Sequence, residues 1–558
     1  MSCSSSDDTD RRRSSGVCTS SGTRCRSSQI AYSGGPTLTF SYDADGNLTG
    51  TSDPSGSYGY HYDRLNRLSS EDQPGPLTIG YTYDAASNLT GIVDAAGTTS
   101  YGYNSENLLV SLLEPGAATP VRFGYDGNGN RTQISYPNTV TETLVYDDAP
   151  RLTRVYAEKP LGSGNILTSF SYCYQATPNP CGGADVGLRT AVTAQYPGAA
   201  ATTSYYCYDG LNRLTSADGA SAACPNASAA YRYAYDASGN LTSKTVNGVT
   251  TSYTVNGANQ LTNAGNGYDG DGSQTADPGV FSASYNALDQ MSSVTPAGGT
   301  ADALSYMGLG QARRVGNGSI GQVNDQLGLN EDTGPTNTFF TRDNTGTILG
   351  ERRAGGAYYF LQDGLGSTAA VTDAGGNVVV SYSYDPYGAT TCTPGGSACS
   401  FYEPIRYAGG YWDQNDPTDD PLYHFGQRYY DPTTARWTQI DPLDNPLDQH
   451  GWNKYIYAGD DPVNFTDPSG MCWNIFCHPI KAAKKTARAV WAHKEQIMFV
   501  GGAAVTCAIW GARAATAAAP LAVAGPEVVA ATAAVGCALA VNAKLHAADY
   551  AKWKYNHG

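Results

Sequence analysis

Aspartate residues followed by proline recur along the chain, and carboxylates are side chains that can catalyse hydrolysis. Two carboxylates held close together in a low-dielectric interior share a proton, so one can activate water while the other protonates or polarises a scissile amide. Asp-Pro is also an ordinary turn dipeptide, and the residue types alone favour turns. The Asp-Pro steps include those at Asp53, Asp385, Asp416, Asp420, Asp431, Asp441, Asp461 and Asp467.

A second candidate for chemistry is the segment Cys472-x4-Cys477-His478, because thiols and imidazoles bind metals. A further ligand would have to come from His493 or beyond, so we expect free or disulfide-bonded cysteines here and neither a metal nor a cofactor. The His and Asp side chains of residues 544–557 invite a nuclease interpretation. Since no second acidic or His cluster accompanies them, a solvated amphipathic helix is the preferred interpretation.

The thirteen cysteines include three close pairs inside Gly/Pro/Ala-rich segments that look like loop insertions. Local disulfides in an oxidising compartment are expected for them, although spacing alone does not determine connectivity. The pairs are Cys173/Cys181, Cys207/Cys224 and Cys392/Cys399.

Composition indicates the kind of fold that positions these groups. The chain has 558 residues with 65 Gly, 41 Tyr and only 15% charged residues, and up to about residue 470 Tyr, Thr, Ser, Gly, Asn and Asp dominate, which suits strands and tight turns. The formal charge of −16 argues against the basic surface that nucleic-acid binding needs. We therefore expect an all-β protein whose main body does not bind nucleic acid.

The first residues differ from the rest of the chain. They carry the run Arg11-Arg12-Arg13 and many Ser, but no apolar stretch long enough for the core of a signal peptide. We expect residues 1–34 to form a disordered leader or the remnant of a longer protein, and export to use a route without an N-terminal signal peptide.

One phrase recurs along most of the chain: an aromatic residue, any residue, Tyr-Asp, two further residues, Gly or Asn, Asn or Arg, and Leu-Thr. The copies are residues 40–49, 60–69, 81–90, 101–110, 123–132, 206–215 and 233–242, with degenerate copies near Tyr253, Tyr285 and Tyr382. In the first part of the chain the second aromatic recurs at steps of 20 to 22 residues, at Tyr42, Tyr62, Tyr83, Tyr103, Tyr125 and Tyr146.

The phrase predicts a β-hairpin. Tyr-x-Tyr places two aromatic rings on one face of a strand, Asp-x-x-Gly/Asn forms a turn that tolerates positive φ, and Asn/Arg-Leu-Thr begins the return strand. A single hairpin is only marginally stable, so successive units of about twenty residues must stack edge to edge into a continuous sheet.

The Tyr-Asp phrase at this period resembles the YD repeat of the Rhs proteins, the Tc toxin C subunits and the teneurins, over residues 35 to 470. The resemblance implies that the hairpins spiral into a large hollow β-shell, here assigned to residues 35–355. The chain from Phe360-Leu-Gln-Asp-Gly to Asp467-Pro-Ser-Gly470 is similar to the Rhs-associated core domain, assigned to residues 356–471.

In the family this core domain houses a self-cleaving aspartyl protease built from the Arg of an Arg-Tyr-Tyr-Asp-Pro phrase and the Asp of two later Asp-Pro steps. The resemblance implies Arg428, Asp441 and Asp467 as the catalytic residues of a single-turnover autoprotease, with the arginine keeping one carboxylate ionised and positioned. The implied cut lies between Met471 and Cys472 and would release 87 residues. The chain departs from the family pattern in the long interval after Asp441 and in lacking a Gly directly after Asp-Pro-Leu there.

Beyond Gly470 the composition changes to Ala, Val and Lys, which predicts a small α-helical domain over residues 472–558. A basic amphipathic helix over 479–494 precedes apolar runs of about fourteen residues, shorter than the roughly twenty that span a bilayer. Membrane-inserting helices with basic flanks are slightly preferred over the buried helices of a small domain, which makes this tip a membrane-active rather than catalytic effector.

The resemblance implies a secreted or surface-bound polymorphic toxin for competition between cells, whose shell encloses its own C-terminal tip and releases it by self-cleavage. Its implied partners are an immunity protein, a secretion-apparatus spike protein and a target membrane. The alternative is a structural or adhesive surface protein that binds carbohydrate or a partner protein. A third interpretation is a shell fragment without function, because residues 35 to 470 are few for a closed container, and its exposed strand edges would promote aggregation.

Overall fold

The computed structural model describes residues 2–6, 12–18, 25–32, 35–178, 181–218, 224–334, 336–393, 401, 403–413, 422–442 and 453–471. The chain divides into two units: the first comprises residues 1–441 and 445–471, and the second comprises residues 442–444 and 472–558. The helices expected in residues 472–558 therefore lie outside the described residues. In the part of the chain that is described, no helix has the length and apolar character needed to cross a membrane.

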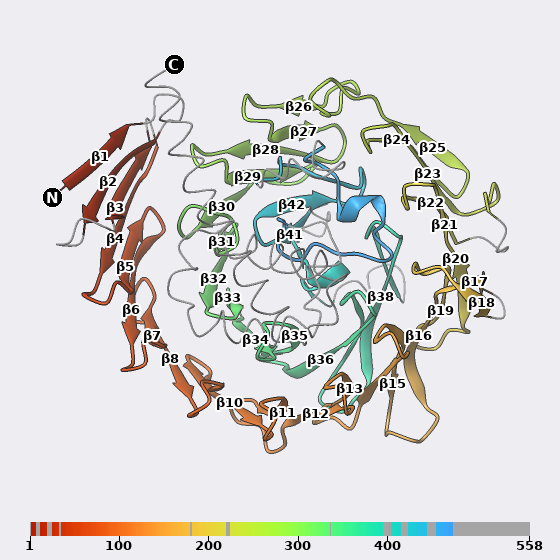
Figure 1. The fold of residues 1–558 in the computed structure, drawn as a ribbon, viewed down its shortest axis with the longest axis horizontal. Helices are drawn as coiled ribbons and strands as arrows, with labels where there is room; N and C mark the ends of the chain where they lie inside the picture. Colours follow the sequence, from red (N-terminus) through yellow and green to blue (C-terminus); the bar gives the residue numbers. More distant parts are fainter. Residues whose placement is uncertain are drawn as a thin grey trace, which may run out of the picture. The chain divides into compact units, whose positions relative to one another are not determined.

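The first unit is built almost entirely of antiparallel strands, as the sequence predicted (Figure 1). Its largest sheet has eighteen strands, each paired with the next along the chain except that β16 pairs with β19. These strands are β1 (Ser2–Ser6), β2 (Arg12–Cys18), β3 (Cys25–Tyr32), β4 (Thr37–Tyr42), β5 (Leu48–Asp53), β6 (Gly56–Tyr62), β7 (Leu68–Asp72), β8 (Thr78–Tyr83), β9 (Leu89–Asp94), β10 (Gly97–Tyr103), β11 (Leu109–Leu113), β12 (Val121–Tyr125), β13 (Arg131–Ser135), β14 (Thr141–Tyr146), β15 (Leu152–Glu158), β16 (Ile166–Cys173), β19 (Ala191–Gln195) and β20 (Thr202–Tyr205).

The remaining strands form four further sheets. A two-stranded sheet contains β17 (Gln175–Pro178) and β18 (Cys181–Asp185), and a five-stranded sheet contains β21 (Cys207–Tyr208), β22 (Leu214–Ala217), β23 (Tyr231–Tyr235), β24 (Leu241–Val246) and β25 (Val249–Ser252). A four-stranded sheet contains β40 (Tyr411–Trp412), β41 (Tyr423–Phe425), β42 (Arg428–Asp431) and β43 (Arg436–Trp437), with the short 3-10 helices η2 (Tyr407–Gly409) and η3 (Ala458–Asp460) nearby in sequence.

The second-largest sheet has fourteen strands, again in chain order. Its strands are β26 (Gly267–Tyr268), β27 (Gln274–Asp277), β28 (Phe281–Tyr285), β29 (Met291–Pro296), β30 (Asp302–Tyr306), β31 (Arg314–Asn317), β32 (Ile320–Asp325), β33 (Gly328–Thr333), β34 (Thr338–Arg342), β35 (Ile348–Arg353), β36 (Gly356–Gln362), β37 (Thr368–Thr372), β38 (Val378–Tyr384) and β39 (Thr390–Thr393).

The N-terminal segment departs from the expectation of a disordered leader over residues 1–34. Strands β1, β2 and β3 occur there, and β3 pairs with β4 through Gln29 opposite Thr39. The physical reason is that the first YD hairpin presents an open strand edge, whose unpaired backbone groups template further strands even from a Ser-rich sequence.

Each repeat forms the predicted hairpin, and the repeat at residues 81–90 shows how. The backbone N–H of Ser87 donates to the Asp84 carbonyl (3.1 Å), and Ser87 adopts the positive φ of 66° that Gly or Asn supplies in other copies. Asp84 accepts the backbone N–H and the side-chain amide of Asn88, both at 2.8 Å. A β-bulge lies between Thr82 and Tyr83. The Asp of the phrase therefore closes the turn, and the bulge turns the second Tyr toward the neighbouring repeat.

Successive repeats are joined by side-chain hydrogen bonds to the backbone. The second Tyr of a phrase donates its hydroxyl to the carbonyl of the Leu in the repeat before it, at 2.7–2.9 Å. The pairs are Tyr62–Leu48, Tyr83–Leu68, Tyr103–Leu89, Tyr125–Leu109 and Tyr235–Leu214. These bonds explain why Tyr recurs in the phrase, whereas Leu recurs because its side chain is part of the buried core.

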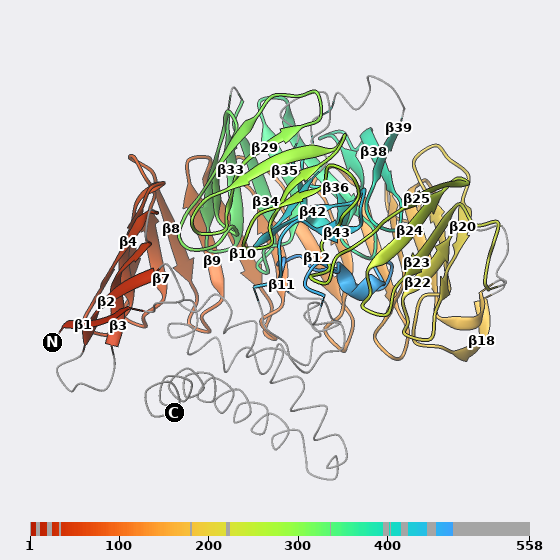
Figure 2. The same ribbon diagram turned by 90° about the horizontal axis from the view of Figure 1, so that it is seen from above.

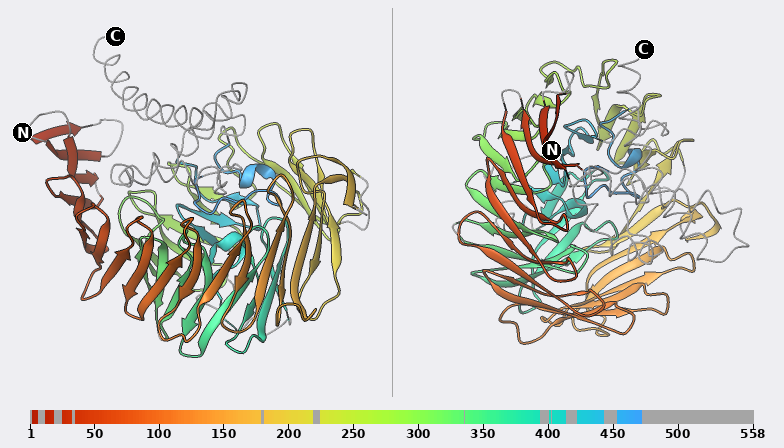
Figure 3. Two further views of the ribbon diagram at one scale, coloured as in Figure 1. Left: turned by 60° about the horizontal axis from the view of Figure 1, so that its bottom comes forward. Right: turned by 60° about the vertical axis from the view of Figure 1, so that its left-hand side comes forward.

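Strands β32–β38 of the fourteen-stranded sheet lie along the inner side of strands β6–β16 of the eighteen-stranded sheet, and the two sets share one core (Figures 1, 2 and 3). The shared core contains the first aromatic residue of several phrases, including Tyr81 and Tyr101, with Leu361 from the other sheet. The hydroxyl of Tyr136 donates to the carbonyl of Phe360, 224 positions later. Burying this Tyr row between two layers removes apolar area from water, which stabilises hairpins that are marginal alone.

The four-stranded sheet β40–β43 lies inside the curve of the repeat strands (Figure 1). Its aromatic residues Tyr423, Tyr430 and Trp437 share one core with Leu214 and Leu241 of the five-stranded sheet. The repeat strands therefore surround and support the segment that carries the candidate site.

Candidate functional site

The side chains of the three residues implied as catalytic lie together, next to the four-stranded sheet. Arg428 is the first residue of β42, Asp441 follows β43, and Asp467 lies in the segment after η3. The side chains of Arg428 and Asp467 are 2% and 0% exposed, and that of Asp441 is 15% exposed. One carboxylate is thus fully enclosed, whereas the other retains access to water.

Arg428 bridges the two carboxylates. Its Nη2 atom lies 3.0 Å from Oδ2 of Asp441 and 3.1 Å from Oδ2 of Asp467. Its Nη1 atom donates to the Lys454 carbonyl at 3.2 Å, and its guanidinium carbon lies 4.1 Å from the centre of the Trp437 ring. Since a guanidinium is planar and always charged, this setting fixes the distance between the two acids.

Asp467 also contacts the predicted cleavage segment. Its Oδ1 atom accepts hydrogen bonds from the backbone N–H of Met471 at 3.1 Å and from Oγ of Ser469 at 3.0 Å. The carbonyl of Gly470 accepts a hydrogen bond from Nε of Arg428. The backbone on the N-terminal side of the predicted cut is therefore held by two of the three candidate catalytic side chains. Cys472, on the other side of the cut, lies outside the described residues.

Two glycines allow the backbone around residue 426 to lie directly against the backbone of residues 469–470. Gly426 has φ +48° and a Cβ there would collide with the carbonyl oxygen of Ser469, while Gly470 has φ +63° and a Cβ there would collide with that of Phe425. The backbone N–H of Gln427 donates to the Ser469 carbonyl at 2.9 Å. In the sequence these glycines stand inside longer phrases with no sign of this role, and only the long-range pairing reveals it.

Aromatic side chains pack beside Arg428 and Asp467 on the buried side of this site. Tyr457 is fully buried, and its ring centre lies 4.2 Å from that of Tyr430 and 5.5 Å from that of Trp437. Burial, with the negative charge of Asp467 adding to it, raises the pKa of the Tyr457 hydroxyl. Tyr457 therefore stays neutral, and the low dielectric strengthens the interactions of Arg428 with its two acids.

Three other Asp-Pro steps form turns, as the residue types alone predicted. Asp385 accepts the backbone N–H groups of Tyr387 and Ala389, both at 2.9 Å. Asp431 accepts the backbone N–H of Thr433 at 2.7 Å, and Asp461 likewise accepts a bond within its own turn from Asn464. Asp416 and Asp420 lie outside the described residues.

A second carboxylate pair was not predicted from the sequence. Asp277 is buried, and its pKa is raised to about 7 by burial and by the charge of Asp431. Burial also raises the pKa of Asp431. The two residues are 154 positions apart, so sequence spacing gives no sign of the pair.

Two of the expected disulfides are confirmed. Cys173 is bonded to Cys181 and Cys207 to Cys224. Cys392 is disulfide-bonded as well, and Cys399, its expected partner, lies outside the described residues.

Two stretches of the first unit match known protein families. Residues 42–78, 62–99 and 83–119 match the RHS Repeat, and residues 329–463 match the Teneurin YD-shell. Both matches support an Rhs/YD-repeat family protein. The family expected from the Tyr-Asp phrase is thereby confirmed.

Solved structures share the fold. The crystal structure of TcdB2-TccC3-TEV superimposes with a TM-score of 0.60 at 19% identity, over 83% of this chain and 28% of that chain. The Photorhabdus luminescens Tc holotoxin pore gives a TM-score of 0.60 at 18% identity, over 84% of this chain and 27% of that chain. The expected all-β YD shell is confirmed by this likeness.

Curated relatives cover shorter stretches. The tRNA3(Ser)-specific nuclease WapA of Bacillus spizizenii is 27% identical over 255 residues, which are 43% of this chain and 11% of the relative. The double-stranded DNA deaminase toxin A of Burkholderia cenocepacia is 31% identical over 129 residues, which are 23% of this chain and 8% of the relative. The chain thus spans about a tenth of the length of the curated relatives that it matches.

Proposed function

We propose that this chain belongs to an Rhs-type toxin, in which a YD-repeat shell supports a self-cleaving core that releases the C-terminal effector. The family likeness and two curated relatives, one named a deaminase toxin and the other a tRNA-specific nuclease, support the toxin class. The observation that carries the cleavage is the position of Arg428 Nη2 at 3.0 and 3.1 Å from Asp441 and Asp467, beside the backbone of Met471.

The proposed reaction is hydrolysis of the Met471–Cys472 peptide bond. Asp441, the more exposed acid, takes a proton from a water molecule, whose oxygen attacks the Met471 carbonyl carbon. Asp441 passes this proton to the Cys472 nitrogen as the carbon–nitrogen bond breaks. Asp467 stays ionised and holds the Met471 N–H, and Arg428 stabilises the charge of both carboxylates. The products are a carboxylic acid at Met471 and an amine at Cys472, which together contain the atoms of the one added water molecule.

The test compares denatured masses of three purified chains. The parent is expected to split into residues 1–471 and 472–558, whereas the Asp441→Asn/Asp467→Asn variant is expected to stay whole. Asp53→Asn, at an Asp-Pro step that binds Ser55 and Gly308 instead, is the matched control and should split like the parent. An intact parent, or cleavage that persists in the double variant, would refute the protease assignment.

The proposed setting is export to the cell surface or beyond, and delivery to a competing cell. There the released residues 472–558 act on a target membrane, and an immunity protein protects the producer. A secretion-apparatus spike protein is the proposed delivery partner. Co-expression of residues 472–558 with the product of the neighbouring small reading frame tests this: we expect growth arrest from the tip alone and rescue by the neighbour.

A second function is favoured by one observation, the Teneurin YD-shell match over residues 329–463. It suggests an adhesive surface protein that recognises carbohydrate or a partner protein. An uncleaved chain that stays at the cell surface and binds a glycan array would favour this function over the toxin.

A further inference from the structure

A buried arginine from the repeat region reaches the segment that carries Asp467. Arg189 lies between β18 and β19 and is 7% exposed. Its Nη1 atom donates to the Val463 carbonyl at 2.8 Å, and its backbone N–H donates to Oδ1 of Asn464 at 2.9 Å. Its Nη2 atom donates to the Gly364 carbonyl at 3.3 Å. One residue therefore ties together three segments that are far apart in sequence.

The residues that Arg189 holds lead directly into the candidate site. Asn464 precedes Asp467 by three positions, and its side-chain amide donates to Asp461 at 2.8 Å and to the hydroxyl of Tyr208 at 2.9 Å. Val463 is buried in the aromatic core that also contains Trp437. With Asn464 fixed from both sides, the backbone has little freedom before it reaches Asp467.

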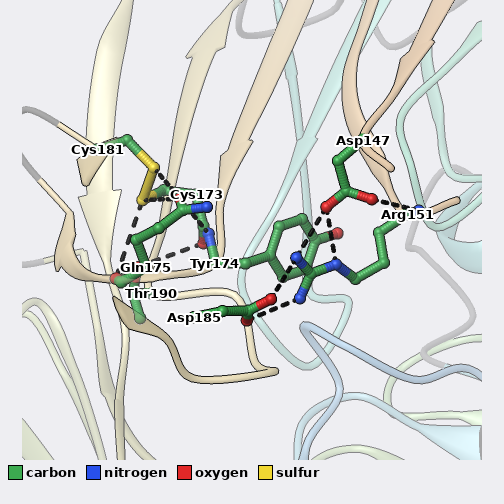
Figure 4. Close-up of a disulfide and its surroundings, with 8 residues drawn as sticks. All are labelled: Asp147, Arg151, Cys173, Tyr174, Gln175, Cys181, Asp185 and Thr190. Atoms are coloured by element: carbon green, nitrogen blue, oxygen red, sulfur yellow. Dashed lines mark hydrogen bonds and ion pairs between the residues drawn. A yellow bond between two sulfur atoms is a disulfide. The ribbon is translucent and has the colours of Figure 1, made fainter. Parts of the chain in front are cut away.

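Arg189 is in turn held by segments next to two disulfides. The N–H of Thr190 donates to the carbonyl of Cys173 at 2.7 Å, and Cys173 is bonded to Cys181 (Figure 4). On the other side, the hydroxyl of Tyr208 donates to the Arg189 carbonyl at 2.6 Å, and Tyr208 follows Cys207 of the second disulfide. Cross-links restrict the conformations open to a loop, so both disulfides keep Arg189 in place.

We propose that Arg189 is a positioning residue for self-cleavage, which orients Asp467 through Val463 and Asn464 and is itself braced by the Cys173–Cys181 and Cys207–Cys224 disulfides. The consequence for cleavage rests on the proposed function. The orientation of residues 461–471 does not, so the two can be tested separately.

The chain offers a matched control in Arg151. This arginine forms ion pairs with Asp147 at 2.8 Å and Asp185 at 2.7 Å, and it lies over the ring of Tyr174 at 4.5 Å (Figure 4). Arg189 contacts the same Tyr174, whose hydroxyl accepts from its Nε atom at 3.3 Å. Both arginines thus pack on one tyrosine, but Arg189 is the one that binds Val463 and Asn464.

The experiment measures amide hydrogen exchange of the peptide 461–471 and the cleavage rate constant, in the full chain and its variants. Exchange is read in the Asp441→Asn/Asp467→Asn background so that every sample is intact. Arg189→Ala should raise exchange of this peptide at least tenfold and slow cleavage at least tenfold, and Arg151→Ala should change neither. Guanidinium chloride at tens of millimolar should reverse both effects in Arg189→Ala by filling the vacated site, which a merely destabilised shell would not show.

Arg189→Lys is the second variant, for use if Arg189→Ala does not fold, because its ammonium retains a donor but lacks the forked geometry. It should give an intermediate increase in exchange. Cys173→Ser/Cys181→Ser should raise exchange of 461–471 in the same direction. Unchanged exchange in the folded Arg189 variants would overturn the proposal whether or not the parent cleaves. Raised exchange with a parent that never cleaves would support the positioning of Asp467 and refute the proposed function alone.

Discussion

The hydroxyl group of Tyr103 donates a 2.9 Å hydrogen bond to the backbone carbonyl of Leu89, one repeat earlier in the chain. The same bond recurs from repeat to repeat, so the YD phrase encodes the contact between hairpins as well as the hairpin itself. This gives the repeat a physical reason: Tyr supplies the donor, and the bulge before it sets its direction.

Replacing Tyr103 by Phe removes this donor and leaves a partly buried carbonyl without it. We expect Tyr103→Phe to lower the free energy of unfolding by about 1–2 kcal/mol, seen as a lower urea midpoint with an unchanged slope. Leu65→Ala is the control, because Leu65 is 67% exposed at the tip of a turn and should leave the midpoint unchanged. A Tyr103→Phe midpoint equal to that of the parent would show that the bond between repeats adds no stability.

The stability of the shell should fall as pH rises through neutrality. Burial raises the pKa of Glu142, Asp277 and Glu351 to about 7 each. An unfolded carboxyl ionises near pH 4, so between about pH 4.5 and 7 the folded state binds more protons, and stability decreases with pH across this window. Below it the sign reverses, because turn residues such as Asp63 and Asp84 have a lowered pKa and lose stabilising bonds on protonation.

Thermal unfolding between pH 4 and 8.5 measures this dependence, and we expect a maximum near pH 5. In the parent the N–H of Gln362 donates to Oε1 of Glu142 at 2.8 Å. Glu142→Gln keeps an oxygen that can accept this bond and removes the group that titrates. Between pH 5 and 8 the free energy of unfolding should fall in both proteins, and the fall should be smaller in this variant by on the order of 3 kcal/mol. Identical pH profiles for the parent and Glu142→Gln would contradict the assignment of a raised pKa to this residue.

Local features of the fold were predictable from sequence, and contacts between distant residues were not. The Asp84 turn and its strands follow from residue chemistry within ten positions, which is why the repeat predicts them. The contact between Arg189 and Val463 joins positions 274 apart, and no periodicity contains it. The grouping of Arg428, Asp441 and Asp467 was implied by family resemblance, since Asp-Pro steps by themselves indicate turns.

Gly426 should be essential for the site because of space as well as conformation. A Cβ at this position would collide with the Ser469 carbonyl, which is part of the segment that Asp467 holds. We expect Gly426→Ala to slow release of residues 472–558 at least tenfold. Gly279→Ala is the matched control: Gly279 also has positive φ, +77°, but a Cβ there would meet nothing within 4 Å, so only backbone strain of about 1 kcal/mol is added.

Release is followed by gel electrophoresis after dilution from denaturant. A Gly426→Ala chain that cleaves as fast as Gly279→Ala would show that the close approach of the two backbone segments is dispensable.

The position directly after the turn is Arg in some repeats and Asn in others, so each residue can be substituted by the one that another repeat uses. Arg67 binds its own Asp63 through Nε at 2.7 Å and the carbonyl of Asp84 in the next turn at 2.9 Å. Asn88, at the same position one repeat later, likewise binds Asp84 and reaches Asn107 in the next turn. Both side chains thus connect the Asp of their own turn to the next turn, and the Arg side chain is the longer of the two.

We therefore expect Arg67→Asn to change the free energy of unfolding by less than about 0.5 kcal/mol, whereas Arg67→Leu should cost about 1–2 kcal/mol by leaving Asp63 and the Asp84 carbonyl without this donor. The urea midpoints of the two variants measure the difference. Equal losses would mean that the cation over the Tyr83 ring, 4.7 Å from its centre, stabilises this turn more than the hydrogen bonds do. If both variants lose little free energy of unfolding, the buried Tyr and Leu rows provide most of the stability of the repeat, and the bonds between turns only set the register.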